Sequence, residues 1–211
     1  KFFFVNHKRT KYKTSFCYNI NEEKDKKHDR IIFDLSNNQK LIYNDIRKFG
    51  FIKFIKQVNL EQNTHLKYLG PEPLSNKFNF EYFKNYIKRR ERTIKDLLMD
   101  QKFISGLGNI YVNEILFFSG IRPSKKIKKI TNLEIQKIIK FSKKIISKAI
   151  VLGGSSIKDF SSSSGKKGSF QQHFSVYGKK GENCLKVKCS GKIRKIVIAN
   201  RASFFCNKCQ K

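Results

Sequence analysis

Apolar residues in the first quarter of the chain recur with the two-residue period of β-strands. Segments 1–5 (KFFFV), 30–35 (RIIFDL) and 40–45 (KLIYND) are apolar throughout or alternate with polar positions. The string Ser-Asn-Asn at 36–38 is typical of a hairpin turn between the last two segments. Segment 50–58 (GFIKFIKQV) keeps the strand pattern, so a sheet is predicted through residue 58.

A break at 68–73 (YLGPEP) holds two of the three prolines, and beyond it the apolar period becomes helical. One predicted helix carries on one face Phe80, Phe83, Tyr86 and Ile87. The next predicted helix carries Ile94, Leu97 and Leu98. The change of period at a proline-rich break indicates a domain boundary there.

Two further helices are predicted from their end signals. Asn109 follows the string GLG and is predicted to cap a helix that ends at residue 119. Thr131 and Glu134 form a capping-box pattern at the start of a helix that ends before residue 153. The apolar positions of this helix are predicted to face inward: Ile135, Ile138, Ile139, Ile145, Ile146 and Ile150.

The charge of the chain favours a polyanion as its partner. The 46 basic and 16 acidic side chains give a net charge of +30, which suits nucleic acid. Lysine outnumbers arginine 37 to 9 and Ile, Asn and Phe are frequent, as an A/T-biased genome would produce, so part of the charge is compatible with drift. No apolar run approaches the ~20 residues of a membrane span, and a soluble protein is expected.

Four cysteines near the C-terminus have the spacing of a metal site. They stand as C-x4-C and C-x2-C, sixteen residues apart: Cys184, Cys189, Cys206 and Cys209. Two close thiolate pairs suit a tetrahedral zinc ion, and segment 191–205 between them is predicted to be a β-hairpin that turns at 199–200. Two disulfides are the alternative. The odd fifth cysteine, Cys17, favours a reducing compartment and therefore zinc.

Three short strings are candidate nucleic-acid contacts. GLGN places two glycines and the Asn109 amide at a helix N-terminus, which favours an anion, although such strings are more often plain turns. Arg201 at the hairpin tip suits a phosphate grip or a solvated turn. Arg47 and Phe49 fall on one side of an extended segment. They suit either a base-stacking wedge or an arginine paired with Asp45 beside a core phenylalanine.

No catalytic group is evident from these residues. The acids form no dyad, the four histidines lack metal-ligand spacing, and no serine stands in a nucleophile elbow. Residues 161–168 (SSSSGKKG) have the composition of a flexible loop. The residues alone therefore predict binding of polyanions without a visible nucleophile.

Several strings in order along the chain resemble the formamidopyrimidine-DNA glycosylases, bacterial-type enzymes that remove oxidised purines. They are KHDRIIFDL, DIRKFG, LGPEPLS, LLMDQKFISGLGNIYVNEILFFSGIRP, LGGSSIKDF, VYGKKGENC and RASFFCNKCQK. The resemblance spans nearly the whole chain. It implies an α+β fold with a partial N-terminal β-sandwich, then a helical helix–two-turn–helix domain with a C-terminal zinc-ribbon β-hairpin.

The resemblance also implies where the domains lie. The C-terminal portion of the β-sandwich is expected at 1–66 and a hinge at 67–75. The helix–two-turn–helix domain follows at 76–160, then a mobile lesion-capping loop at 161–173 and a zinc finger at 174–211. DNA is expected in the cleft between the two main domains, and one structural Zn2+ is the implied cofactor.

The roles of the candidate residues follow from the resemblance position by position. Asn109 and Arg201 correspond to residues that pinch a phosphate flanking the lesion. Arg47 corresponds to the arginine that pairs with the orphaned cytosine, and Phe49 to the intercalating wedge. Lys166 matches a GK position in the loop that closes over the flipped base.

The chain departs from the family pattern at several positions. Lys48 stands where a second arginine is usual, which is expected to weaken one phosphate contact. Residues 185–188 widen a cysteine pair that is usually C-x2-C, which puts its geometry in doubt. The family nucleophile, an N-terminal proline followed by glutamate, is missing, as are an upstream lysine and a methionine wedge. Because Lys1 opens directly in a predicted strand, we expect either truncation or gene decay upstream.

The resemblance implies a DNA repair glycosylase with AP-lyase activity that forms a Schiff base with the sugar of duplex DNA containing 8-oxoguanine or formamidopyrimidines. One rival is a non-catalytic, zinc-dependent remnant that binds damaged DNA. The other is the sister branch acting on oxidised pyrimidines, against which DIRKFG and the long loop before VYG both argue. A monomer in a bacterial-type cytoplasm, associated with the nucleoid and with no membrane, is expected.

Overall fold

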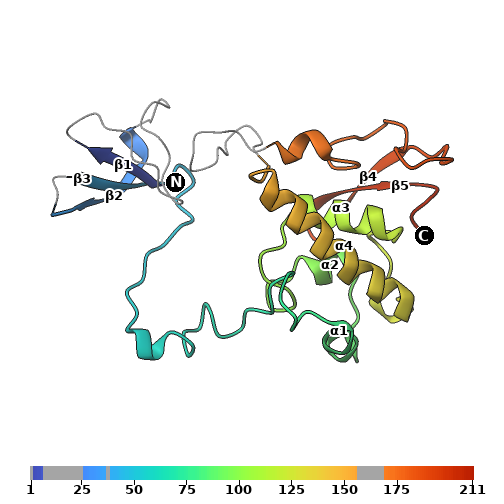
Figure 1. The fold of residues 1–211 in the computed structure, drawn as a ribbon, viewed down its shortest axis with the longest axis horizontal. Helices are drawn as coiled ribbons and strands as arrows, with labels where there is room; N and C mark the ends of the chain where they lie inside the picture. The colour runs from blue at the N-terminus through green and yellow to red at the C-terminus, as the bar shows by residue number, and fades with distance from the viewer. Residues whose placement is uncertain (1, 7–25, 37–38, 156–168) are drawn as a thin grey trace. The chain divides into compact units, whose positions relative to one another are not determined.

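The computed structural model describes four stretches of the chain (Figure 1): residues 2–6, 26–36, 39–155 and 169–211. They fall into two compact units, Lys1–Ile55 with Leu152–Gln172 and Lys56–Val151 with His173–Lys211. The predicted loop at 161–168, with Lys166 in it, and Cys17 lie outside the described residues. The mixture of helices and antiparallel sheets confirms the predicted α+β class.

The first unit is built on a three-stranded antiparallel sheet. Its strands are β1 (Phe2–Asn6), β2 (Asp29–Asp34) and β3 (Gln39–Asn44), and β3 lies in the middle. A hydrogen bond from the Leu35 N–H to the Gln39 carbonyl, 2.8 Å long, closes the connection between β2 and β3. The three strands predicted from their apolar pattern are therefore confirmed.

The strand predicted over 50–58 is wrong. Residues 51–56 have no regular structure and lead into a single 3-10 turn, η2 (Gln57–Asn59). The apolar side chains of this segment lie in solvent, with 66% of Phe51 and 89% of Phe54 exposed. A strand needs a neighbour for its N–H and C=O groups, and no strand of the described residues pairs with this segment.

The second unit is organised around one buried helix, α3 (Asn109–Ser119). It packs against α2 (Ile94–Leu98), α4 (Asn132–Val151) and the C-terminal hairpin, while α1 (Phe80–Ile87) packs against α4 (Figure 1). Seven of the eleven residues of α3 are buried, which explains why its sequence is apolar nearly all round. The predicted hinge at 67–75 lies inside this unit, and the functional domain boundaries stay a prediction.

The capping box predicted at the start of α4 is confirmed. The Thr131 N–H donates to Glu134 Oε2 at 2.9 Å, and the Glu134 N–H donates to Thr131 Oγ1 at 3.2 Å. The Lys125 ammonium pairs with Glu134 at 2.6 Å. Burial raises the pKa of Glu134, but the Lys125 ammonium and the hydrogen bond from the Thr131 N–H outweigh burial and lower this pKa.

The predicted inward face of α4 is partly wrong. Ile150 exposes 64% of its surface, and Ile139 and Ile146 are only half-buried. The buried positions are spaced by three and four residues, as a 3.6-residue period requires: Ile135, Ile138, Ser142, Ile145 and Ala149. Ile139 and Ile146 lie at the edge of this stripe, so they are hydrophobic without facing the core directly.

The C-terminal hairpin forms as predicted. Strands β4 (Ile193–Ile198) and β5 (Arg201–Cys206) are antiparallel, and Ile198 stands opposite Arg201. Ala199 and Asn200 have φ angles of 48° and 57°, the left-handed conformation that a two-residue hairpin turn requires. This turn places Arg201 at the exposed tip of the hairpin.

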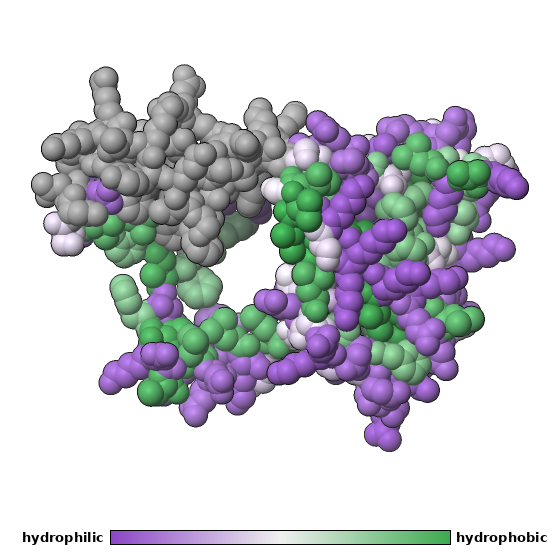
Figure 2. Space-filling model, viewed as in Figure 1, coloured by the Kyte–Doolittle hydropathy of each residue, from purple (hydrophilic) through white to green (hydrophobic). Residues whose placement is uncertain are grey.

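Hydrophilic side chains cover much of the second unit on the face seen in Figure 2, in keeping with the net charge of +30. Among the described residues, no helix combines the length and the apolarity needed to cross a bilayer.

Candidate nucleic-acid interface

The N-terminus of α3 is a candidate anion site. Gly108 is its N-cap and has no side chain to satisfy the first N–H groups, and the first turn carries no acidic residue. Backbone N–H groups and the positive end of the helix dipole therefore favour a negatively charged ligand there. The prediction that Asn109 caps this helix is wrong, because Asn109 is its first helical residue and its side chain bonds elsewhere.

The side chain of Asn109 reaches the C-terminal hairpin. Its Nδ2 donates to the carbonyl of Ala202, the residue after Arg201, at 3.1 Å. Asn113, one turn along α3, donates to the Asn109 carbonyl and accepts the Phe204 N–H, both at 2.6 Å. The structure thus brings Asn109 next to the backbone that carries Arg201, two residues far apart in sequence.

Lys95 on α2 joins this contact, and its role was missed in the sequence. The side chain is 1% exposed, and its Nζ donates to the Ala202 carbonyl and to Ser203 Oγ, both at 2.7 Å. Burial lowers the pKa of Lys95 to about 8, and the nearby charge of Arg201 contributes to this shift. The available signal was a lysine next to Ile94 and one helical turn before Leu98, a spacing that lets its stem lie along the apolar face of a helix.

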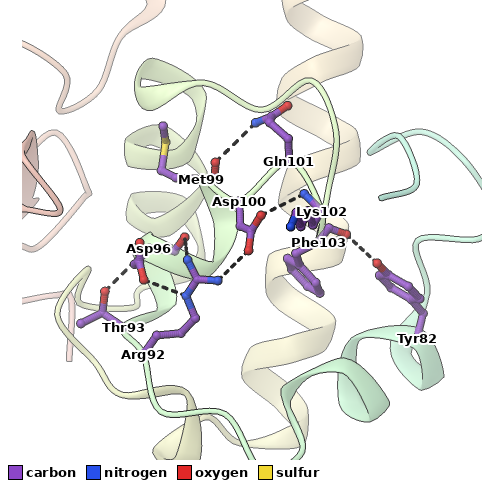
Figure 3. A network of polar contacts seen from close by, with 9 residues as sticks. All are labelled: Tyr82, Arg92, Thr93, Asp96, Met99, Asp100, Gln101, Lys102 and Phe103. Carbon is purple, nitrogen blue, oxygen red and sulfur yellow. Dashed lines mark hydrogen bonds and ion pairs between the residues drawn. The ribbon is translucent and has the colours of Figure 1, made fainter. Parts of the chain in front are cut away.

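A cavity of about 560 Å³ opens beside the hairpin tip. Its wall combines basic groups with apolar ones and includes Lys95, Met99, Gln101, Lys102, Ile198 and Arg201. The wall also holds two acids, and both are paired with one arginine, as Figure 3 shows, while three further basic groups remain. The cavity therefore presents a net positive surface around Arg201.

The arginine that pairs with both acids is Arg92. Its Nε pairs with Asp96 at 2.7 Å and its Nη1 with Asp100 at 2.6 Å (Figure 3). Burial opposes ionisation of Asp100, but the Lys102 N–H and Arg92 outweigh it and lower the pKa of this carboxyl. Both acids are paired with Arg92, and neither forms an ion pair with Lys102 or Arg201 of the wall.

Gln101 fixes the loop that leads into α3. Its Oε1 accepts the Gly106 N–H at 2.8 Å and its Nε2 donates to the Leu107 carbonyl at 3.0 Å. Gly106 has a φ of 81°, a conformation that side chains disfavour. The two glycines of the GLGN string thus form a clamped turn that orients the N–H groups at the start of α3.

Arg47 and Phe49 lie in a loop of the first unit. The Asp45 carboxylate organises this loop by accepting the N–H of Arg47 at 3.1 Å and that of Gly50 at 2.9 Å. These N–H groups, Gly50 first, lower the pKa of Asp45. The segment is bent rather than extended as predicted, because Lys48 adopts a left-handed φ of 56°.

The bend brings the two predicted contact residues together. The Arg47 guanidinium lies over the Phe49 ring, 4.7 Å from its centroid, and 77% of Phe49 is exposed. The alternative that Phe49 is a core residue is wrong. A guanidinium stacked on an exposed ring is a surface that can stack on a nucleic-acid base.

The four C-terminal cysteines form one cluster. Their sulfur atoms all lie within 4.8 Å of one another, with Cys184–Cys209 and Cys189–Cys206 at 3.7 and 3.6 Å. These separations exceed a disulfide bond and are close to the about 3.8 Å between ligands of a tetrahedral Zn–S site. All four are free thiols, so the cluster fits a tetrahedral metal ion.

The second cysteine pair has the hydrogen bonds of a tight metal-binding turn. The N–H groups of Lys208 and Cys209 point at Cys206 Sγ, at 3.4 and 3.5 Å. Burial raises the pKa of this thiol, but the two N–H groups outweigh it and the pKa falls to about 7. Cys206 is therefore readily available as a thiolate ligand.

A family model described as the formamidopyrimidine-DNA glycosylase H2TH domain matches residues 69–161. The formamidopyrimidine-DNA glycosylase of Roseobacter denitrificans is 38% identical over 185 residues, which are 88% of this chain and 65% of that protein. That of Rickettsia bellii is 40% identical over 196 residues, 93% of this chain and 71% of that protein. The chain thus spans 65 to 71% of the length of these relatives.

Solved structures of FPG proteins are similar in fold to this chain. A mutant Lactococcus lactis FPG in complex with Fapy-dG-containing DNA has a TM-score of 0.82 and 32% identity, covering 100% of this chain and 71% of that one. The MutM (FPG) protein from Thermus thermophilus has a TM-score of 0.79 and 32% identity, covering 89% and 70%. These similarities confirm the fold that the sequence strings predicted.

Proposed function

The chain belongs to the formamidopyrimidine-DNA glycosylase family, and on that premise we propose that its residues form the DNA-gripping part of a base-excision repair glycosylase for oxidised purines. The observation that carries the proposal is the contact between Asn109 and the Ala202 carbonyl. It supports the proposal because it holds the start of α3, a candidate anion site, against the backbone next to Arg201, so that one phosphate could meet both an amide and a guanidinium. Arg is suited to this because its planar fork holds two phosphate oxygens at once.

We assign Arg47 and Phe49 to the gap that an extruded base leaves in the duplex. Flipping a nucleotide out of the duplex costs a few kcal/mol of stacking and base-pairing free energy. An inserted side chain partly offsets this cost. The exposed Phe49 ring can stack on a base pair, and the guanidinium above it can donate to the orphaned base. The assignment of Lys166 to the lesion-capping loop stays a prediction.

The chemistry of this reaction is carried in the family by an N-terminal proline, whose amine attacks the sugar, and the glutamate that follows it. The 211 residues begin Lys-Phe-Phe and contain no such pair at their start. We therefore expect this chain, tested by itself, to bind lesion DNA without forming the covalent Schiff base.

The cysteine cluster would hold a structural Zn2+ through Cys184, Cys189, Cys206 and Cys209. Four thiolates leave no open coordination position for a reacting group, so the ion would fix the hairpin and take no part in the reaction. The contribution of these residues is to keep β4 and β5 together at the base of the hairpin, opposite the Arg201 tip.

Borohydride trapping on a duplex that contains 8-oxoguanine tests this proposal. The chain should shift the duplex in a native gel and leave no covalent adduct after reduction. The same chain joined to a proline–glutamate N-terminal segment from a family member should give the adduct. An adduct from the 211 residues alone would show a nucleophile within them and contradict the proposal. Binding with no adduct from the extended chain would favour the alternative of a non-catalytic protein for damaged DNA.

A further inference from the structure

The loop between Cys184 and Cys189 is two residues longer than the turn of the second cysteine pair. Three of its four residues are exposed, including Leu185 at 61% and Val187 at 90%. Lys188 adopts a left-handed φ of 62°. A wider loop has more conformations to lose when its two thiolates converge on one ion, so it needs an anchor that a tight turn does not.

Lys186 is the half-buried residue of this loop, and it contacts three residues. Its Nζ donates to the carbonyl of Phe117 at 2.7 Å and lies 4.8 Å from the centroid of the Phe117 ring. Its carbonyl accepts the Cys189 N–H at 3.1 Å. Its backbone N–H donates toward the sulfur of Cys184, where it opposes the rise in thiol pKa that burial causes. One residue thus touches both ligands of the wide pair and the helix α3.

Phe117 lies in the last turn of α3, where the helix dipole is negative and carbonyl groups lack helical partners. Four thiolates around a divalent ion leave a net negative charge as well. The Lys186 ammonium is bound to a carbonyl at this negative end of α3, and its loop carries two of the four thiolates.

We infer that Lys186 is a positioning residue that fastens the wide cysteine pair to the C-terminal end of α3 and thereby retains the metal ion. The inference rests on the metal-binding part of the proposed function. It makes α3 a common support, with the anion site at its start and the metal loop held at its end. Partners that orient metal ligands affect metal affinity by about 10- to 100-fold, which sets the size of the expected effect.

The test is zinc release from the loaded protein to a chromogenic chelator. Lys186→Met keeps the apolar stem and removes the charge and the donor, and it should weaken zinc retention by about 10- to 100-fold. Lys188→Met is the matched control, because it removes an exposed lysine from the same loop, and it should retain zinc like the wild type. Lys186→Arg should restore most of the retention, since a guanidinium can also donate to the Phe117 carbonyl.

A second measurement separates anchoring from a general loss of stability. At full zinc loading, Lys186→Met should speed hydrogen exchange at the amides of Gly120 and Cys189 while leaving α1 protected. Equal zinc retention in Lys186→Met and Lys188→Met would overturn the inference and leave the proposed function intact. A wild type that takes up no zinc would instead contradict the metal part of the proposed function, and this inference with it.

Discussion

Side chains from two helices converge on the backbone of β5 directly after Arg201. The Ala202 carbonyl accepts from both Lys95 and Asn109, and the Phe204 N–H donates to Asn113. A half-buried acceptor with two donors is held in one orientation, so α2 and α3 influence the direction in which Arg201 leaves the hairpin. The nearby charge of Arg201 also contributes to the lowered pKa of Lys95, after burial.

At this scale, Lys95→Met should remove a dependence of stability on pH. The pKa of Lys95 is about 8 in the folded protein against 10.5 in the unfolded chain. Between these values the unfolded state binds more protons, so the free energy of unfolding rises with pH, by a contribution on the order of 3 kcal/mol. Denaturant unfolding at pH 7.5, 9 and 10.5 should show this rise in the wild type and in Lys137→Met, a variant of an exposed lysine on α4. If the free energy of unfolding changed with pH in the same way in Lys95→Met and the wild type, Lys95 would not be the source of this dependence.

Arg201→Ala should weaken duplex binding by ~1–3 kcal/mol, the usual range for loss of a charged hydrogen bond. The matched control is Arg194→Ala, which removes an exposed arginine from β4 of the same hairpin, opposite Phe205 and away from the tip. Gel-shift titrations at one salt concentration give both affinities. If the two variants lose affinity equally, Arg201 acts only as one charge among many.

Among the elements, the sequence predicted those whose signals are local. The capping box of α4 and the Ala-Asn turn of the hairpin depend on neighbouring residues, and both formed as predicted. The segment 50–58 failed because alternation of apolar residues does not supply a partner strand. Lys95 and Lys186 were missed because each acts on a carbonyl far away in sequence, a contact that no local pattern contains.

The hairpin should depend on the metal ion for its order. Two strands alone are marginally stable in water, and β4 and β5 are joined at their open end by the cysteine cluster. Removing the ion with a chelator, or Cys206→Ser, should speed hydrogen exchange in both strands by roughly 100-fold or more, because structural zinc supplies folding free energy. Added Zn2+ should reverse the effect of the chelator but not that of the substitution. Unchanged exchange after chelation would mean that packing against α3 alone holds the hairpin.

For the whole molecule, charge and shape make separate contributions to binding. The net charge of +30 attracts any nucleic acid by release of counterions, and this contribution falls steeply with salt. In the proposed function, the stacked Arg47–Phe49 pair would add a contribution that depends on a gap or a bend in the duplex. Only the Arg47–Phe49 contribution can distinguish damaged from intact DNA. The two contributions are therefore separated by measuring the affinity for a damaged and for an intact duplex at the same salt concentration.

The most direct measurement is therefore the affinity for a duplex with a tetrahydrofuran abasic-site analogue opposite cytosine, compared with the same duplex undamaged, at about 150 mM salt, the physiological range. Binding to the damaged duplex should be at least about tenfold tighter, because a missing base makes bending and insertion easier. Phe49→Ala should reduce this preference more than it reduces binding to intact DNA. Equal affinities for the two duplexes would contradict recognition of damage by this chain and leave a basic protein that binds nucleic acid by charge alone.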